Sequence, residues 1–413
     1  MKEAVNILVL TPYLPTPPNT GGRRRMHALI SRLARFHNVT LLSFVDGSGE
    51  PLAVEAARRI CARVVVVPNP RASASGLRKR WLQARSIASF SSAARQALRT
   101  PAMQDAIDAL ARETEFDLTL VEFAQMAGYS FPTSGPVVLD EHNIEYDILR
   151  RTFETERGPL RKLFSFIEHR KLRAEERAAW ARLDGCVFTS SRDYAIARTA
   201  EKAIPMSVVP NGVDVSEFVP VDVARSKDIL FFGADFYPNT DAIRFYADEV
   251  FPSVLADEPS ARLVVVGQVG DALRDRPRPG VLIVGAVPDI RAYISRAAVV
   301  VAPLRIGGGT RLKILEAMAM GRPVVATRIG AEGIDAMPER DLLIADDPTE
   351  LARATVRVLA DARLACTVGM SGRALVQRLY DWEVLGSQLD RFIRTLLSQR
   401  RTYRFALGRE RVG

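Results

Sequence analysis

Apolar residues occur in two patterns along this chain: short, largely uninterrupted runs, and longer segments in which they return every three or four positions. Short runs occupy residues 6–10, 136–140, 229–233 and 299–304. Runs of this length are typical of parallel strands buried on both faces, whereas a spacing of three to four is typical of helices. The alternation of the two predicts an α/β protein with parallel sheets.

Residues 299–334 combine two predicted strands with a glycine turn and a helix. After the strand 299–304, the turn Gly307-Gly308-Gly309 leaves backbone amides without side-chain cover, and Thr310 predicts the N-cap of a helix over 311–320. Gly321 then ends the helix and a strand follows over 324–327. Because the first amides of a helix carry partial positive charge, this unit predicts a site for an anion such as a diphosphate.

Three charged residues of this helix are candidates for the same site. Glu316 stands between Leu315 and Ala317, which is not the setting of a solvated acid. Since helical side chains lean toward the N-terminus, Glu316 can point at the glycine turn and accept hydrogen bonds from sugar or ribose hydroxyls. Arg311 and Lys313 are the nearest cations for a diphosphate. For each of the three, the alternative is an exposed surface residue.

Two further segments predict ligand groups in the N-terminal half. The strand 6–10 is followed by Gly21-Gly22, directly before a helical pattern over 23–36. This predicts a second unit of strand, glycine loop and helix, and a simple tight turn is the alternative for the glycine pair. His142 follows the strand 136–140, at the end where open α/β sheets place their ligand groups. The alternative is a capping cluster in which Asn143 starts the next helix.

At the segment LEAMAMGRPVVAT, which contains Glu316, the chain resembles the retaining glycosyltransferases of family 4. The resemblance extends over nearly the whole chain and implies the GT-B architecture, with two facing Rossmann-like domains. It implies that Glu316 binds the ribose of a nucleotide-sugar donor and that His142 faces the donor sugar. It also implies that the Gly21-Gly22 loop faces the donor phosphates and the acceptor.

The chain departs from this family at two places. Gly308 stands where the family has the first of two glutamates that contact the donor. The family's Arg and Lys in the first loop of the C-terminal domain are also missing, because residues 233–237 read Gly-Ala-Asp-Phe-Tyr. Donor contacts made by these groups in the family must therefore come from backbone amides, Thr310, Arg311 or Lys313.

Length and cysteine content agree with a two-domain protein of a reducing compartment. The chain has 413 residues, and we predict an N-terminal domain over 1–205 and a C-terminal, nucleotide-sugar-binding domain over 206–413 with a terminal helix and basic tail. The three cysteines, Cys61, Cys186 and Cys366, have no metal-ligand spacing. No signal peptide and no run of roughly 18 apolar residues occurs, so we expect a cytoplasmic protein, soluble or peripheral on the inner face of the cell membrane.

Positive charge is concentrated in the first half of the chain. Residues 1–205 contain 30 Lys and Arg against 22 Asp and Glu, and the rest contains 27 against 26. Residues 56–104 contain ten cations and no acid, including Arg78-Lys79-Arg80 before Trp81. This segment predicts contact with an anionic membrane surface, and a solvated basic face is the alternative. Nucleic acid is a weaker interpretation because no recognition motif accompanies the charge.

The absence of certain motifs narrows the chemistry. The chain has no P-loop, no GxGxxG and no Asp-x-Asp, the motif that usually holds a divalent metal in the other large glycosyltransferase architecture. We therefore predict a retaining glycosyltransferase without metal or cofactor that uses a nucleotide-sugar donor and a sugar or lipid-linked acceptor. The resemblance implies front-face displacement, with His142 as the catalytic candidate. A nucleotide-sugar epimerase of the same architecture and a non-catalytic binding protein are the alternatives.

Overall fold

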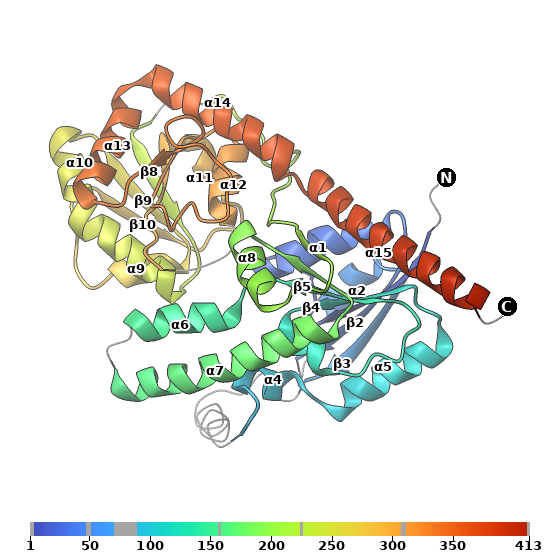
Figure 1. Cartoon of the computed structure of the whole chain (residues 1–413). Helices are drawn as coiled ribbons and strands as arrows, with labels where there is room; N and C mark the ends of the chain where they lie inside the picture. The colour runs from blue at the N-terminus through green and yellow to red at the C-terminus, as the bar shows by residue number, and fades with distance from the viewer. Residues whose placement is uncertain are drawn as a thin grey trace. The chain divides into compact units, whose positions relative to one another are not determined.

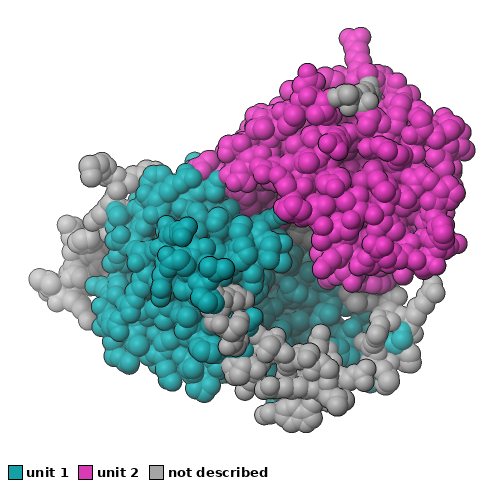
Figure 2. Space-filling view, turned by 180° about the vertical axis from the view of Figure 1, so that it is seen from behind, with its two compact units in different colours: residues 1–209, 385–413 teal, residues 210–384 magenta. Residues whose placement is uncertain are grey.

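The computed structural model describes residues 4–46, 51–69, 89–155, 158–223, 226–306 and 311–410. The chain divides into two compact units, shown in different colours in Figure 2: unit 1 is residues 1–209 with 385–413, and unit 2 is residues 210–384. Each unit has a parallel sheet with helices packed against it (Figure 1). The α/β fold class with parallel sheets, predicted from the alternating runs, is confirmed.

Unit 1 contains a parallel sheet of seven strands among the described residues, in the order β3-β2-β1-β4-β5-β6-β7. Its strands are β1 (Asn6–Thr11), β2 (Asn38–Val45), β3 (Arg63–Pro68), β4 (Leu118–Glu122), β5 (Val137–Glu141), β6 (Gly185–Phe188) and β7 (Met206–Val208). The central strands are almost wholly buried, as their uninterrupted apolar sequences require. The strand order reverses between β1 and β4, which is where such sheets bind ligands at the carboxyl ends of their strands.

Helices flank the sheet of unit 1. They are α1 (Gly21–Ala34), α2 (Pro51–Arg58), α4 (Ala93–Leu98), α5 (Pro101–Glu113), η1 (Ala124–Gly128), α6 (Glu145–Thr155), α7 (Pro159–Arg182) and α8 (Ser191–Ala200). Helices α6 and α7 pack side by side (Figure 1). The buried core of the unit includes Met103, Phe116, Trp180 and Phe188.

Unit 2 repeats the same topology with six strands among its described residues, in the order β10-β9-β8-β11-β12-β13. Its strands are β8 (Asp228–Phe232), β9 (Arg262–Val266), β10 (Val281–Gly285), β11 (Val299–Ala302), β12 (Val324–Ala326) and β13 (Leu343–Ile344). Its helices are α9 (Tyr237–Phe245), η2 (Tyr246–Val250), α10 (Phe251–Asp257), η3 (Gln268–Leu273), α11 (Arg291–Arg296), α12 (Leu312–Ala319), α13 (Pro348–Ala360) and α14 (Ala362–Leu379). The order reverses between β8 and β11.

The last helix, α15 (Trp382–Glu410), changes the predicted domain division. We predicted a boundary at 205/206 and assigned the terminal helix to the second domain, whereas residues 385–413 group with unit 1 and the first boundary falls at 209/210. Side-chain contacts explain this grouping. His37 Nε2 lies 2.8 Å from Asp390 Oδ1, and Arg400 Nη2 lies 3.2 Å from Asp184 Oδ1. A methyl group on Gly185 would lie 3.1 Å from Leu396.

Helix α1 also begins earlier than predicted. We expected Gly21 and Gly22 in a loop before a helix over 23–36, but both glycines form the first turn of α1. Thr20 is the N-cap, and its side chain accepts a hydrogen bond from the amide of Arg23 at 3.4 Å. The cap explains the earlier start because it satisfies one of the orphan amides of the first turn.

The three cysteines differ in exposure: Cys61 and Cys186 are buried, and Cys366 is exposed.

No helix among the described residues has both the length and the hydrophobicity needed to span a bilayer. Arg78, Lys79, Arg80 and Trp81, on which the predicted membrane contact depends, lie outside the described residues. That contact therefore stays a prediction.

Candidate active site

The carboxyl ends of β1, β4 and β5 in unit 1 bring together most of the polar residues of the first candidate site. Leu10 of β1 pairs with Val121 of β4, so the next residues, Thr11 and Glu122, end neighbouring strands at the same edge. His142 follows directly after β5. All three side chains are buried. His142 therefore lies at the strand end where the sequence predicted it, next to the point at which the strand order reverses.

His142 is held by Glu122 and by Phe123. Its Nε2 shares a hydrogen bond of 2.7 Å with Glu122 Oε2, and its ring stacks on Phe123 with centroids 3.8 Å apart. Thr189 donates a hydrogen bond to the backbone carbonyl of His142 at 3.0 Å. Phe123 has a φ of 68°, a conformation that costs energy for a residue with a side chain. The strained backbone aims the Phe123 ring at the imidazole.

Asp140 and Arg25 form a buried ion pair beside this histidine. The guanidinium donates to both Asp140 oxygens, with Nε to Oδ2 at 2.8 Å and Nη2 to Oδ1 at 2.6 Å. Its Nη1 donates to the carbonyl of Val209 at 2.8 Å. The fork geometry matches the carboxylate, which is the arrangement that makes such pairs strong. The pair connects α1 to the end of β5, directly before His142 in the sequence, and so holds these two elements together beside the histidine.

Gly22 lies close enough to this cluster that a larger residue would collide with it. A methyl group there would be 2.5 Å from the Tyr13 hydroxyl, 3.3 Å from Phe123 Cζ and 3.7 Å from His142 Nδ1. Nδ1 is the imidazole nitrogen near the glycine, and the other nitrogen, Nε2, is bonded to Glu122. The sequence-predicted residues Gly22 and His142 therefore meet in one cluster within unit 1, and Gly21 precedes Gly22 in the same helical turn.

Burial controls the protonation of this cluster. It lowers the pKa of His142 to about 3, so the imidazole is neutral at physiological pH. Burial raises the pKa of Glu122 well above its usual range, and the charge of Asp140 raises it further. Burial likewise raises the pKa of Tyr13 to about 12. With Arg25 and Asp140 balancing each other, a protonated Glu122 and a neutral His142 leave the buried cluster without net charge.

Glu122, Asp140 and His142 also form the one group of possible metal ligands among the described residues, with one ligand atom of each within 4.8 Å of the others. Arg25 engages both oxygens of Asp140, however, and its positive charge disfavours a second cation at the same place. We therefore assign no metal to this group, and the expectation of a metal-independent protein stays a prediction.

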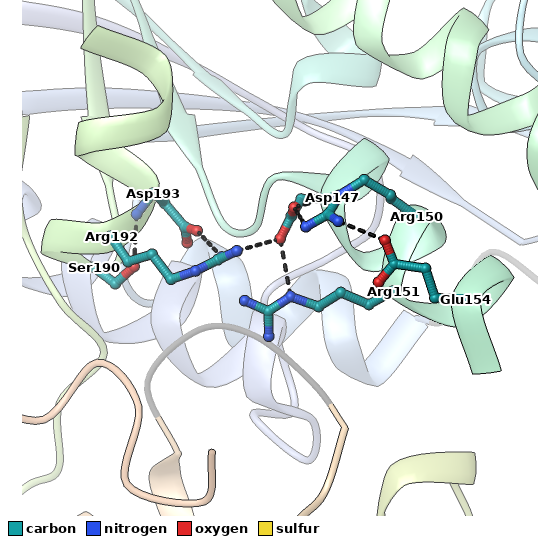
Figure 3. A network of polar contacts seen from close by, with 7 residues as sticks. All are labelled: Asp147, Arg150, Arg151, Glu154, Ser190, Arg192 and Asp193. Atoms are coloured by element: carbon teal, nitrogen blue, oxygen red, sulfur yellow. Dashed lines mark hydrogen bonds and ion pairs between the residues drawn. The ribbon is translucent and has the colours of Figure 1, made fainter. Parts of the chain in front are cut away.

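A polar network borders the site where α6 and α8 begin (Figure 3). Asp147 accepts hydrogen bonds from Arg150 Nη2 at 2.9 Å and from Arg192 Nη2 at 2.6 Å, and Arg151 Nε lies 3.1 Å away. Arg192 also contacts Asp193, and Arg150 contacts Glu154. These arginines together lower the pKa of Asp147 although burial opposes them. The network joins the two helices that follow β5 and β6.

The alternative explanation of the segment after His142, a cap supplied by Asn143, is not what starts helix α6. The helix begins at Glu145, and the amide of Glu145 donates to Glu176 Oε1 at 2.9 Å. Glu176 comes from α7 and is fully buried. Its acceptor oxygen at the helix N-terminus replaces a local cap.

In unit 2 the second candidate site lies at the end of β8. Lys313 Nζ, from the first turn of α12, donates to Asn239 Oδ1 at 2.8 Å and lies 4.3 Å from the centre of the Phe231 ring. A methyl group on Gly233 would lie 3.3 Å from the same Nζ. Burial, and to a smaller extent the charge of the nearby Arg311, lower the pKa of Lys313 to about 7. The ammonium therefore sits at the first βα loop, where the family's Arg and Lys are missing.

The remaining predicted donor residues surround this lysine or lie outside the described chain. Glu316 is buried on α12, one turn after Lys313, as its apolar neighbours predicted. Arg311 occupies the N-cap position of α12, so the helix starts at Leu312 and the prediction of Thr310 as the cap is wrong. Gly307, Gly308, Gly309 and Thr310 lie outside the described residues. Gly321 ends the helix as predicted, with a φ of 68°.

The sequence analysis did not identify several residues of this cluster. They are Glu122, Phe123, Tyr13 and the ion pair of Arg25 with Asp140. Glu122 ends a largely apolar run at 118–122, the same signal that identified His142, so strand ends alone could have found it. No local pattern marks Phe123, because its importance comes from a backbone conformation and a ring contact.

Residues 226–361 match the family described as Glycosyl transferases group 1. The chain is 27% identical to a lipopolysaccharide core biosynthesis mannosyltransferase, LpcC, of Rhizobium leguminosarum bv. viciae, over 60% of this chain and 74% of that protein.

Among solved structures, the sucrose-phosphate synthase of Thermosynechococcus elongatus superposes with a TM-score of 0.68 at 19% identity, covering 95% of this chain and 100% of that one. Anabaena Alr3699/HepE in complex with UDP superposes with a TM-score of 0.66 at 15% identity, covering 94% of this chain and 100% of that one. Together, these matches relate the chain to the glycosyltransferases with the GT-B fold.

Proposed function

We propose that this chain, as a GT-B glycosyltransferase, moves a sugar from a nucleotide-diphosphate donor to an acceptor hydroxyl with retention of configuration, in the synthesis of a cell-surface polysaccharide or glycolipid. The observation that carries the proposal is the position of Lys313. Its ammonium lies beside Gly233 at the end of β8, next to the point where the strand order of unit 2 reverses. A cation at this point suits a diphosphate.

The chemistry proposed for transfer needs no protein nucleophile. The bond between the anomeric carbon and the diphosphate oxygen breaks, and the acceptor oxygen bonds to the same face of that carbon. Negative charge grows on the departing diphosphate, where Lys313 and the first amides of α12 stabilise it, and the acceptor proton passes to a phosphate oxygen. Glu316 would accept hydrogen bonds from the ribose hydroxyls.

His142 supplies a neutral hydrogen-bonding group in unit 1. A nitrogen with a pKa of about 3 is too weak a base to remove a proton from a hydroxyl group at neutral pH. Its proposed role is therefore to hold a sugar hydroxyl through Nδ1, while Glu122 occupies Nε2. Gly22 keeps a side chain away from Nδ1, because a methyl group there would lie 3.7 Å from that nitrogen and 2.5 Å from the Tyr13 hydroxyl.

Two relatives support the choice of substrates. By its name, the Rhizobium protein is a mannosyltransferase of lipopolysaccharide core biosynthesis, and the Anabaena protein binds UDP. These properties favour a nucleotide-sugar donor and a cell-surface saccharide or glycolipid as product.

The test is a panel of UDP-, GDP-, ADP- and dTDP-sugars offered to the full-length chain, first by thermal shift and then with saccharide and lipid-linked acceptors. We expect one nucleotide class to stabilise the protein, by about 2.7 kcal/mol at 100 times its dissociation constant. The product should keep the donor's anomeric configuration in its NMR spectrum. Inversion would refute retention, conversion of the donor without an acceptor would indicate an epimerase, and no stabilisation by any donor would indicate a non-catalytic protein.

A further inference from the structure

The long helix α7 in unit 1 has all its acids on one side and most of its cations on the other. Glu168, Glu175 and Glu176 are its acids, and all three are buried. Each of them accepts backbone amides of a neighbouring helix start. Glu168 Oε2 accepts the amide of Ala93 at 2.8 Å, Glu175 Oε1 accepts the amide of Ser92 at 2.8 Å, and Glu176 Oε1 accepts the amide of Glu145 at 2.9 Å.

The opposite side of the helix is exposed and carries only cations and apolar groups among its described residues. The exposed residues recur every three or four positions, as on one face of a helix. Over residues 162–178 they are Lys162, Leu163, Phe166, Arg170, Arg173, Ala174, Arg177 and Ala178. We call this set the basic face of α7. It contains four cations and no acid.

Two apolar members of the basic face, Leu163 and Phe166, are large and exposed to solvent near the start of the helix. Leu163 is 56% exposed and Phe166 is 39% exposed. Cations lie over the rings at this end, with Lys162 Nζ 5.1 Å from the centre of the Phe153 ring and Arg170 Cζ 5.6 Å from that of Phe166. Exposed aromatic and aliphatic groups among Lys and Arg are typical of helices that lie in the headgroup region of a bilayer.

We propose that the basic face of α7 binds the surface of a membrane containing anionic lipid. Lys162, Arg170, Arg173 and Arg177 attract the negative surface, and Leu163 and Phe166 enter the boundary between headgroups and acyl chains. Because α7 packs along α6, the helix that follows His142, this contact holds the candidate acceptor side of unit 1 at the membrane. The inference extends the proposed function by giving the acceptor a location, but the lipid contact itself does not depend on transfer.

The lipid surface is favoured over nucleic acid by the two apolar side chains. A duplex would use the cations through its phosphates and would gain little from Leu163, which offers no hydrogen bond and no ring to stack on a base. A bilayer uses both kinds of group. The contribution of Leu163 and Phe166 therefore discriminates the two ligands.

The test measures sedimentation of the full-length chain with vesicles of phosphatidylglycerol and phosphatidylcholine, and with vesicles of phosphatidylcholine alone, in the absence of any nucleotide sugar. One variant carries Lys162→Gln, Arg170→Gln, Arg173→Gln and Arg177→Gln, and a second carries Leu163→Ser and Phe166→Ser. A control loses the same charge from exposed arginines of unit 2, through Arg262→Gln, Arg274→Gln, Arg276→Gln and Arg328→Gln.

We expect the parent and the control to bind the anionic vesicles alike and the four-cation variant to bind at least about tenfold more weakly. The Leu163 and Phe166 variant should also bind more weakly, and parental binding should fall as salt rises. Three outcomes would contradict the proposal. The first is equal binding by the parent and the four-cation variant. The second is binding that depends on net charge alone, so that the control and the four-cation variant are weakened equally. The third is unchanged binding by the Leu163 and Phe166 variant, which would refute insertion into the bilayer. Because no donor is present, a failure of the proposed transfer leaves these results unaffected.

Discussion

Glu122 and His142 are joined by a buried hydrogen bond of 2.7 Å, and this bond determines which imidazole nitrogen remains near Gly22. A histidine at a strand end can rotate or change tautomer unless a second group holds it. Here Glu122 holds Nε2 and the Phe123 ring holds the plane of the imidazole. Nδ1, the nitrogen proposed to hold a sugar hydroxyl, is thus selected by residues that need not touch the ligand themselves.

The first prediction compares two substitutions of Glu122. Burial raises its pKa in the folded protein, so above the unfolded pKa the folded state keeps a proton that the unfolded state has lost. Stability from this group therefore declines as pH rises from about 4.3 toward the folded pKa. Glu122→Gln keeps a polar partner for His142 without this titration. We expect its melting temperature to exceed that of the parent at pH 8, with a gain that shrinks toward pH 4.

The control for that comparison is Glu122→Ala. It removes the same titration but leaves His142 Nε2 buried without its partner, which costs about 1 to 3 kcal/mol, so its melting temperature should lie below that of Glu122→Gln at both pH values. If Glu122→Gln melts below the parent at pH 8, Glu122 is ionised in the folded protein and the assignment of its proton is wrong.

A second prediction concerns the space beside Nδ1. Gly22→Ala places a methyl group 2.5 Å from the Tyr13 hydroxyl, and crowding of this kind costs roughly 1 to 3 kcal/mol. We expect a lower melting temperature and a lower kcat/KM. The double variant Gly22→Ala with Tyr13→Phe removes the colliding oxygen and should recover most of both. A double variant no better than Gly22→Ala alone would place the conflict elsewhere.

The third prediction follows from the low pKa of Lys313. At pH 8 a lysine with a pKa of about 7 is mostly neutral, and a bound diphosphate would raise its pKa. Donor binding at pH 8 should therefore take up close to one proton, and affinity should fall as pH rises above 7. Calorimetry of a nucleotide sugar in two buffers of different ionisation enthalpy measures this uptake. Lys313→Arg, which is always charged, should bind without it. Proton uptake equal in parent and variant would separate Lys313 from the diphosphate.

Glu316 is the subject of the fourth prediction. If it accepts ribose hydroxyls, Glu316→Ala should weaken donor binding by roughly 1.5 to 3 kcal/mol, the range for hydrogen bonds to a charged group. The exposed acid Glu350, in the first turn of α13, provides a matched control. Titration of Glu350→Ala should give the parental affinity. Parental affinity in the Glu316 variant as well would remove this residue from the site.

The fifth prediction is that transfer continues in excess chelator. Lys313 and helix amides supply the charge that a metal would otherwise supply to the diphosphate. Activity with EDTA should match activity without it, measured with the donor identified by the panel. Loss of activity that manganese or magnesium restores would contradict this expectation and would direct attention to Glu122, Asp140 and His142.

How far the sequence could predict this site depended on whether each interaction is local. Strand ends and helix periodicity are local, so the fold class, the position of His142 and the burial of Glu316 followed from them. The ion pair of Arg25 with Asp140 joins residues 115 positions apart, and no local sequence pattern around either residue indicates this contact. The same holds for Lys313 and Asn239, 74 positions apart.

Boundaries failed where a side chain from elsewhere in the chain changed the local balance. Asn143 is a good cap by residue type, but the buried carboxylate of Glu176 reaches the first amide of α6 instead. The terminal helix follows unit 2 in sequence, yet contacts such as His37 with Asp390 assign it to unit 1. Local propensity cannot decide such cases because the competing partner is distant along the chain.

Because residues 385–413 of α15 belong to unit 1, the chain order also determines which unit can be completed first during synthesis on the ribosome. Residues 210–384 form unit 2 without interruption, so its whole chain has been synthesised before Asp390 or Leu396 exists. Unit 1, whose strands emerge first, lacks the partners of His37 and Gly185 until residues 385–413 follow. Its flank beside Gly185 therefore stays uncovered while unit 2 is synthesised, and the unit whose synthesis begins first is the one completed last.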